Sequence, residues 1–226
     1  MKKTLITSFF LSLLLSSCPS LVQAGRSYPF ELFWGAQSNL PTPLIIKQEG
    51  EETIRVNQAE YESDAWTWFN SPYYAWRIGL WENNRGWEIE LVHEKIILKN
   101  KPEDVQHFEI SHGYNLITIN RAWKSSKSYH LIWHIGAGIV LTHPETIVRH
   151  KSKGFGASFP EGFYISGLTA QIAVGKRIKV WPGLFGILEA KFTASYATHV
   201  PIADGYAEVP NAAIHGLFGM GYEMVK

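Results

Sequence analysis

The sequence predicts an all-β chain that folds as an antiparallel up-and-down transmembrane β-barrel of eight strands. Roughly eight stretches alternate apolar with polar residues, which is the side-chain period of a β-strand. Short and long connections between these stretches alternate strictly. No stretch after Ala24 reaches the roughly 18 consecutive apolar residues of a membrane helix. A chain that spans a bilayer without helices must close its strand edges in a barrel.

The first 24 residues form a segment of their own. Lys2 and Lys3 precede an apolar run, Leu5–Leu15, and Ala24 ends a small-residue cleavage pattern. This arrangement is typical of a secretory signal peptide. A second cut is also open, because the Leu-Ser-Ser-Cys that ends at Cys18 resembles a lipoprotein cleavage box, which would leave a lipid on that cysteine. Cys18 is the single cysteine, so neither cut allows an intramolecular disulfide.

Residues 25–226 then form one domain of about 202 residues. The formal charge of +1 for the whole chain falls to about −1 once the two signal-segment lysines are removed. This near-neutral balance gives no support to nucleic-acid binding. The 9 Trp, 10 Tyr and 12 Phe suit a lipid-facing surface with aromatic girdles at both interfaces. We therefore expect a monomeric, integral protein of the outer membrane, with membrane lipid as its surroundings.

Eight strands are expected from the alternation. In chain order they are Pro29–Gln37, Tyr73–Trp81, Trp87–Leu98, Phe108–Trp123, Tyr129–Thr142, Phe163–Lys179, Leu184–His199 and Asn211–Met224. On each strand one face is apolar and the other carries charged, amide or glycine residues, so the polar faces would fill a narrow interior as paired charges. The residues expected in this interior are Arg77, Glu88, Glu90, His130, His134, Gln171, Glu189 and Lys191.

The connections predict the orientation of the barrel. The short ones are 82–86, 124–128 and 180–183, and the longer ones are 38–72, 99–107, 143–162 and 200–210. Barrels of this type keep short turns on the periplasmic side, so the long loops should face outside. The first long loop contains two apolar stretches, 44–46 and 53–56, that suit an extra hairpin above the membrane. If that hairpin entered the barrel wall, the count would be ten strands.

Titratable residues gather at the outer ends of the strands. They are His93 and Lys95, then Glu109 and His112, then His143. Histidine suits proton transfer and a nearby carboxylate would orient it, so this rim is a candidate catalytic site. Histidine is equally at home near lipid headgroups, which is the alternative interpretation. Strand parity turns His93 and His112 toward lipid unless a bulge intervenes, and Gly113 is a candidate for such a bulge. A metal on the rim histidines is conceivable by ligand type, but no spacing requires one.

Four segments together resemble a known family. They are Ser71–Arg77 (SPYYAWR), Gly86–Lys95 (GWEIELVHEK), Phe108–Asn120 (FEISHGYNLITIN) and Gly136–Pro144 (GAGIVLTHP). They are similar to segments of the outer-membrane barrels called lipid A oxidases, within the OmpA-like and OmpW-like group of small barrels. The family has threonine where this chain has Ser111, and its first loop does not match.

The resemblance implies an oxidation of the proximal glucosamine of lipid A to an aminogluconate unit, with molecular oxygen as acceptor. Its motif positions correspond here to His93, Lys95, His112, Asn115 and His143. No cofactor other than oxygen is evident.

The other function left open is a non-catalytic barrel that supports the envelope or binds an outside partner through its loops. Trp66, Trp68 and Phe69 of the first loop would then be a contact surface.

Overall fold

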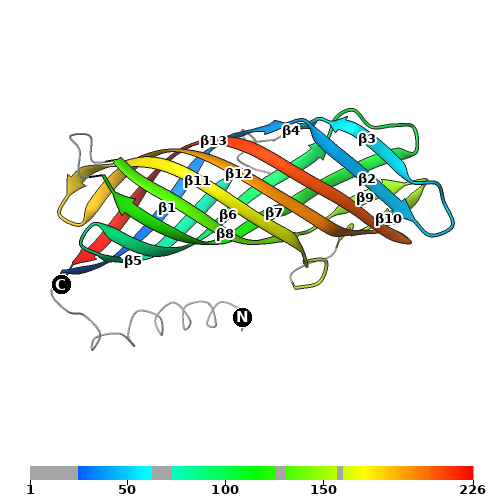
Figure 1. Cartoon of the computed structure of the whole chain (residues 1–226). Helices are drawn as coiled ribbons and strands as arrows, with labels where there is room; N and C mark the ends of the chain where they lie inside the picture. The colour runs from blue at the N-terminus through cyan, green and yellow to red at the C-terminus, as the bar shows by residue number, and fades with distance from the viewer. Residues whose placement is uncertain (1–24, 63–72, 126–130, 157–159, 226) are drawn as a thin grey trace.

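The computed structural model describes residues 25–62, 73–125, 131–156 and 160–225, which form 13 β-strands in a single antiparallel sheet. Eight of the strands pair in a closed ring, because β6 and β7 join the two ends of the path (Figure 1). The strands of this ring are β1 (Arg26–Leu40), β5 (Tyr74–Glu82), β6 (Arg85–Leu98), β7 (Val105–Lys124), β8 (Leu131–Thr142), β11 (Tyr164–Trp181), β12 (Leu184–Ile202) and β13 (Gly205–Val225). The predicted eight-stranded up-and-down barrel is thereby confirmed. In the described part of the chain, no helix has the length and apolar character needed to cross a membrane.

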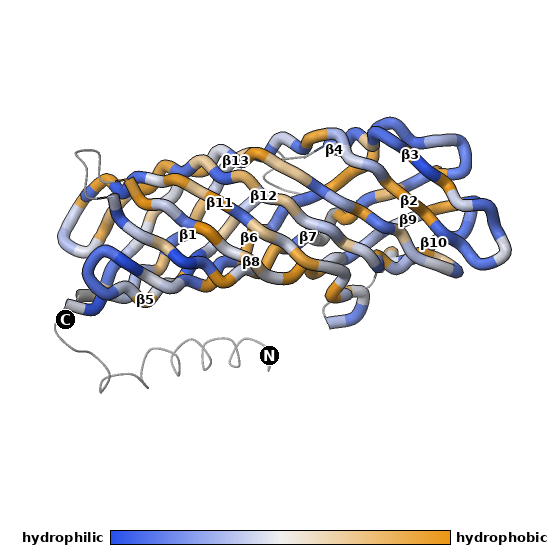
Figure 2. The backbone as a smooth tube through the Cα atoms, viewed as in Figure 1, coloured by the Kyte–Doolittle hydropathy of each residue, from blue (hydrophilic) through white to orange (hydrophobic). Residues whose placement is uncertain are grey.

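The outer face of the ring is a continuous apolar surface. Side chains alternate strictly between this face and the interior, as the pleat of a strand requires. We call the outward set the apolar band; its exposed members include Phe30, Leu32, Ile78, Trp87, Ile89, Ile119, Trp123, Trp133, Ile135, Leu168, Ile172, Ile178, Leu188, Phe192, Tyr196, Ile214, Phe218, Met220 and Tyr222. Figure 2 shows these hydrophobic residues along the ring, whereas the loops at the end that carries β3, β9 and β10 are largely hydrophilic.

The interior of the ring holds a network of paired charges. Arg77 lies at its centre and contacts the carboxylates of Glu31 at 3.0 Å, Glu90 at 3.1 Å and Glu189 at 2.7 Å. We call this the interior charge cluster; its members are Glu31, Arg77, Glu88, Glu90, His134, Glu189 and Lys191, and all are buried. A buried charge is tolerated only when it is paired, and here each carboxylate has a cationic partner.

Amides complete the same network. Gln171 donates to Glu90 at 2.5 Å, and Asn120 donates to the same carboxylate at 2.9 Å. His134 contacts Glu88 at 2.7 Å, as expected for an interior residue. His130, the other histidine expected inside, lies outside the described residues.

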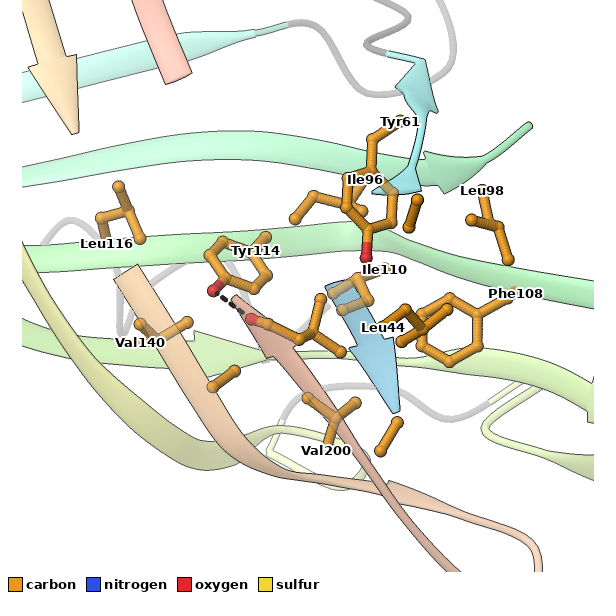
Figure 3. Packing of buried hydrophobic residues seen from close by; sticks show 14 of the residues in the cluster. Leu44, Tyr61, Ile96, Leu98, Phe108, Ile110, Tyr114, Leu116, Val140 and Val200 are labelled. Carbon is orange, nitrogen blue, oxygen red and sulfur yellow. Dashed lines mark hydrogen bonds between the residues drawn. The ribbon is translucent and has the colours of Figure 1, made fainter. Parts of the chain in front are cut away.

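Beyond one end of the apolar band the strands continue into a second, differently built region (Figure 1). We call it the extension; it comprises β2 (Thr42–Gln48), β3 (Ile54–Ala59), β4 (Tyr61–Glu62), β9 (Glu145–Val148), β10 (Lys151–Lys153) and the adjoining ends of β6, β7, β12 and β13. Its interior is apolar, in contrast to the interior charge cluster. Figure 3 shows Leu44, Phe108 and Ile110 packed together, with the Tyr114 hydroxyl bonded to the Val209 carbonyl at 3.1 Å. Each such buried side chain contributes roughly 1.5–3 kcal/mol to stability.

Ion pairs join the loops at the tip of the extension. Arg149 donates to Gln48 at 3.1 Å and to Asp104 at 3.3 Å, so it joins the β2–β3, β6–β7 and β9–β10 connections. Lys151 contacts Asp204 of the β12–β13 turn at 2.8 Å. The four connections at this end are therefore held to one another by side chains.

Two details of the predicted loops are decided by the structure. The apolar stretches of the first loop do form a hairpin, β2–β3, and β2 pairs with the start of β13 outside the ring, so the ring keeps eight strands. The prediction of a long loop at 200–210 is wrong, because β12 runs to Ile202 and β13 begins at Gly205. The two strands stay paired almost to the turn, and their ends are buried in the extension at Val200, Ile202, Ala207 and Val209. Trp66, Trp68 and Phe69 lie outside the described residues.

Candidate functional site

A bulge interrupts the ring where β6 and β7 enter the extension. Glu94 pairs with Tyr114 and Ile96 with Ile110, so the single residue Lys95 lies opposite residues 111–113. Gly113 has φ +124°, and a Cβ at this position would collide with the Asn115 side chain. Only glycine fits such a backbone without strain. The bulge expected at Gly113 is confirmed, and it ends the simple alternation of faces at the rim.

Next to the bulge, polar side chains are buried on the outward face of the ring. His93 Nδ1 and Asn115 Oδ1 are 2.7 Å apart, on adjacent strands in direct register. Asn115 also donates to the Leu141 carbonyl of β8 at 3.3 Å. Tyr74 stacks on the imidazole of His93, with ring centroids 4.7 Å apart. His93 is 7% exposed and Asn115 is 6% exposed. Both are buried although the side chains two positions away on the same strands point to the outside of the ring.

Two further predicted residues lie beside this pair. Lys95, which is 8% exposed, occupies the bulge position, and its carbonyl accepts from Gln37 at 3.1 Å. His143, which is 1% exposed, packs against Phe163 with centroids 4.7 Å apart. The His143 backbone N–H donates to the Gly113 carbonyl at 3.2 Å, which ties the end of β8 to the bulge. We call His93, Lys95, Asn115 and His143 the rim cluster.

Two other predicted residues are not placed in the rim cluster. Glu109 lies on the far side of the bulge, in register with Ile97 and Glu145, and its carboxylate is 3.4 Å from His107. It therefore orients His107 rather than His93. The side chain of His112 lies outside the part that the structure describes, so its role stays a prediction. Among the described side chains, no group of three His, Cys, Asp or Glu is arranged to hold a metal ion.

The rim cluster suits binding of a polar headgroup more directly than it suits any single reaction. Asn115 fixes the orientation of the His93 ring, which is the way an imidazole is prepared for proton transfer. Lys95 supplies a positive charge, and Tyr74 and Phe163 supply aromatic walls that the sequence analysis did not identify. Tyr74 lies directly opposite His93 in the β5–β6 register, which is the signal that would have found it.

A second polar layer, also not identified from the sequence, lies inside the ring behind the rim cluster. His215 contacts the Tyr73 hydroxyl at 2.8 Å and the Thr193 hydroxyl at 2.9 Å. Asn211 donates to Glu94 at 3.2 Å, and all these side chains are buried. Glu94 is an even number of positions from Glu88 and Glu90 on β6, so its side chain points to the inside of the ring as theirs do. The alternation that predicted those two interior residues therefore also predicts Glu94. The layer separates the interior charge cluster from the apolar interior of the extension.

The ring, its apolar band and its charged interior define a class of protein: a small eight-stranded antiparallel barrel with the exterior of a transmembrane protein. Neither a protein-family model nor a curated protein matches the sequence.

Solved structures of outer-membrane proteins show a similar architecture. AlkL in lipid bilayers matches at 10% identity and TM-score 0.48, over 92% of this chain and 94% of its own. Neisserial surface protein A matches at 8% identity and TM-score 0.40, over 88% and 97%. Ail, the attachment invasion locus protein of Yersinia pestis, matches at 10% identity and TM-score 0.40, over 89% and 100%. The fold assignment rests on the strand pairings, not on these likenesses.

Proposed function

We propose that the protein is an integral outer-membrane barrel that modifies lipid A in the outer leaflet. The observation that carries the proposal is the His93–Asn115 pair of the rim cluster, two buried polar side chains on the outward face just beyond the apolar band, with Lys95 and His143 at the adjoining bulge. In a bilayer that covers the band, the extension projects outside and the short turns lie in the periplasm. The rim cluster is then at the level of the outer-leaflet headgroups. The secretory signal that the sequence predicts before Gly25 supports the same address.

The chemistry of the rim cluster supports a phosphorylated sugar as the ligand. Lys95 has an ammonium group that suits a phosphate elsewhere on the lipid, because the anomeric carbon of the oxidised glucosamine must carry a free hydroxyl rather than a phosphate. His93 and Asn115 offer donors and acceptors to sugar hydroxyls. The orientation of His93 by Asn115 suits removal of a proton from a hydroxyl that is being oxidised. These roles fit the reaction that the family resemblance implies, oxidation of the proximal glucosamine to an aminogluconate unit with molecular oxygen as acceptor.

Mass spectrometry of lipid A tests this function. Cells whose lipid A has a free anomeric hydroxyl on the proximal glucosamine are the host. When they express the protein, their lipid A should be heavier by one oxygen atom than lipid A from the same cells without the gene. His93→Ala and Asn115→Ala should abolish the added mass. His107→Ala is the matched control, because His107 pairs with Glu109 beyond the bulge and should leave the modification intact. Unchanged lipid A in cells that contain the folded wild-type barrel would reject the enzyme function.

The second candidate is a non-catalytic barrel that acts through its outer loops. The observation in its favour is the extension, whose connections Arg149 and Lys151 join into one presented surface. A binding surface benefits from this kind of preorganisation. The test of this candidate is a variant that lacks residues 50–68, in cells whose lipid A is unchanged by the protein. Loss of attachment to a surface that cells with the wild-type protein bind would support the candidate. Attachment that survives the deletion would reject these residues as the contact.

A further inference from the structure

A chain of three hollows runs along the outer face of the ring from the apolar band to the end opposite the extension. The first, about 520 Å³, lies over β6, β7, β8, β11 and β12. The other two, about 570 Å³ and 630 Å³, surround the β5–β6 turn at Asn83 and Asn84. Arg121 lines all three, so they adjoin one another around this side chain. A groove that is apolar along one part and polar at its end matches a lipid molecule, which has apolar acyl chains and a polar headgroup.

The apolar part has a floor of small residues beside a ridge of large ones. Ala137, Ala170 and Ala194 are direct neighbours across β8, β11 and β12 on the outward face. The next outward row toward the turns is also in direct register; it runs through Trp87, Arg121, Ile135, Ile172 and Phe192. The difference in side-chain size between the two rows makes the hollow, and its lining has the apolar character that suits an acyl chain.

The polar part carries more basic than acidic side chains, because Glu82, which lines the third hollow, is paired with Arg26. Arg85, Arg121 and Lys124 line the second hollow together with Asn84 and Trp123. Among the described residues neither Arg85 nor Arg121 has a carboxylate partner within ion-pair distance. Arg121 instead donates to the Gly86 carbonyl at 3.3 Å and stacks its guanidinium over Trp87, 5.1 Å from the ring centroid. Arg121 therefore points outward at the edge of the apolar band, held by Trp87 and without an acidic partner among the described residues. An arginine in this position is suited to bind an anionic ligand.

We propose that this groove binds one anionic phospholipid of the periplasmic leaflet, with its phosphate between Arg85 and Arg121 and one acyl chain over the alanine row. The charge complementarity of the two arginines commits the site to an anionic headgroup, as basic pockets at membrane edges generally do. The site rests on the bilayer placement given under the proposed function, and it is independent of any reaction at the rim cluster, which lies at the opposite side of the apolar band.

Native mass spectrometry of the mature chain folded in uncharged detergent tests the site, with phosphatidylglycerol and phosphatidylcholine of identical acyl chains as probes. Phosphatidylglycerol should bind roughly tenfold or more tightly, because each basic residue near an anionic headgroup contributes about fivefold. Arg85→Gln with Arg121→Gln should abolish the preference, and Arg121→Lys should retain part of it. Ala170→Phe should weaken binding of both lipids, because it fills the floor of the groove without changing charge.

Arg55→Gln is the matched control, since this exposed arginine lies on β3 in the extension and should change neither affinity. Inorganic phosphate is the arm for a free anion, and it should compete weakly because it cannot occupy the alanine row. Equal affinity of wild type for both lipids, an unchanged preference in the Arg85/Arg121 variant, or phosphate binding as tight as phosphatidylglycerol would each overturn the proposal. A lipid A result, in either direction, leaves this measurement unaffected, so the two proposals fail separately.

Discussion

Replacement of Arg77 by methionine should be the most destabilising single change inside the ring. Arg77 contacts four carboxylates: Glu31, Glu88, Glu90 and Glu189. Methionine keeps much of the side-chain volume but removes the charge. The carboxylates would then rely on their other partners for compensation.

Those remaining partners determine how much unfolding free energy Arg77→Met costs. Lys191 still contacts Glu90 and lies 3.5 Å from Glu189. Arg177 still contacts Glu31 at 2.7 Å, and His134 still contacts Glu88. Because each carboxylate retains one partner, the cost should equal about one broken buried pair, roughly 3–5 kcal/mol, rather than four. That is a large fraction of the roughly 5–15 kcal/mol that holds a typical domain folded.

Urea unfolding in detergent or vesicles, followed by tryptophan fluorescence, measures the loss. The matched control is Arg26→Met, because Arg26 pairs with Glu82 at an exposed site and an exposed pair contributes only about 0–1 kcal/mol. Glu189→Gln added to Arg77→Met should recover part of the loss, since it removes one of the two carboxylates that would then share Lys191. A loss below about 1 kcal/mol for a folded Arg77→Met ring would refute this account of the interior.

The remaining predictions concern the bulge and the extension. Gly113→Ala should destabilise the ring by about 1–3 kcal/mol in urea unfolding, because it imposes a positive φ on alanine and crowds Asn115; an unchanged midpoint would contradict the bulge. The hydrogen bond from Lys47 holds the pKa of Glu208 below its usual value, so this pair stabilises the extension above the unfolded pKa and the contribution is lost as pH falls through the lowered value. Protease resistance of the extension should therefore fall in acid for wild type. Lys47→Ala should weaken that pH dependence without removing it, because the Tyr196 hydroxyl also donates to Glu208; identical profiles would exclude the pair as its source. Arg149→Ala should speed proteolysis of the outer connections while the ring's unfolding midpoint stays within about 0.5 kcal/mol, and equal cleavage rates would show that the tip is held by other contacts.

Most of the ring could be predicted from the sequence because its signal is local. A strand with an apolar outer face and a polar inner face repeats every two residues, and β5, β6 and β8 follow that repeat closely. The interior pairing of Arg77 with Glu90 followed from the same parity. The ends of β12 and β13 could not be predicted in this way, because Val200 and Val209 become buried only when β2 and the outer part of β7 enclose the extension.

The candidate site was predictable in position but not in construction. Parity correctly gave His93 an outward side chain, and Gly113 correctly marked the bulge. The burial of His93 depends on Tyr74 and Asn115, which two different strand registers bring to its sides. Registers between strands are long-range properties that one strand's sequence does not encode. Glu109 was expected near these residues because it lies at the outer end of the same expected strand as His112, but the three residues of the bulge, 111–113, separate it from Asn115.

The filled interior also bears on transport. Buried carboxylates and cations occupy the ring, and closely packed aliphatic and aromatic side chains occupy the extension, so the described residues make a solid column rather than a tube. Such a column, placed in a planar bilayer, should leave the membrane's electrical conductance at its baseline. Contacts with other molecules would then involve the outside wall and the exposed tip of the described structure rather than its axis.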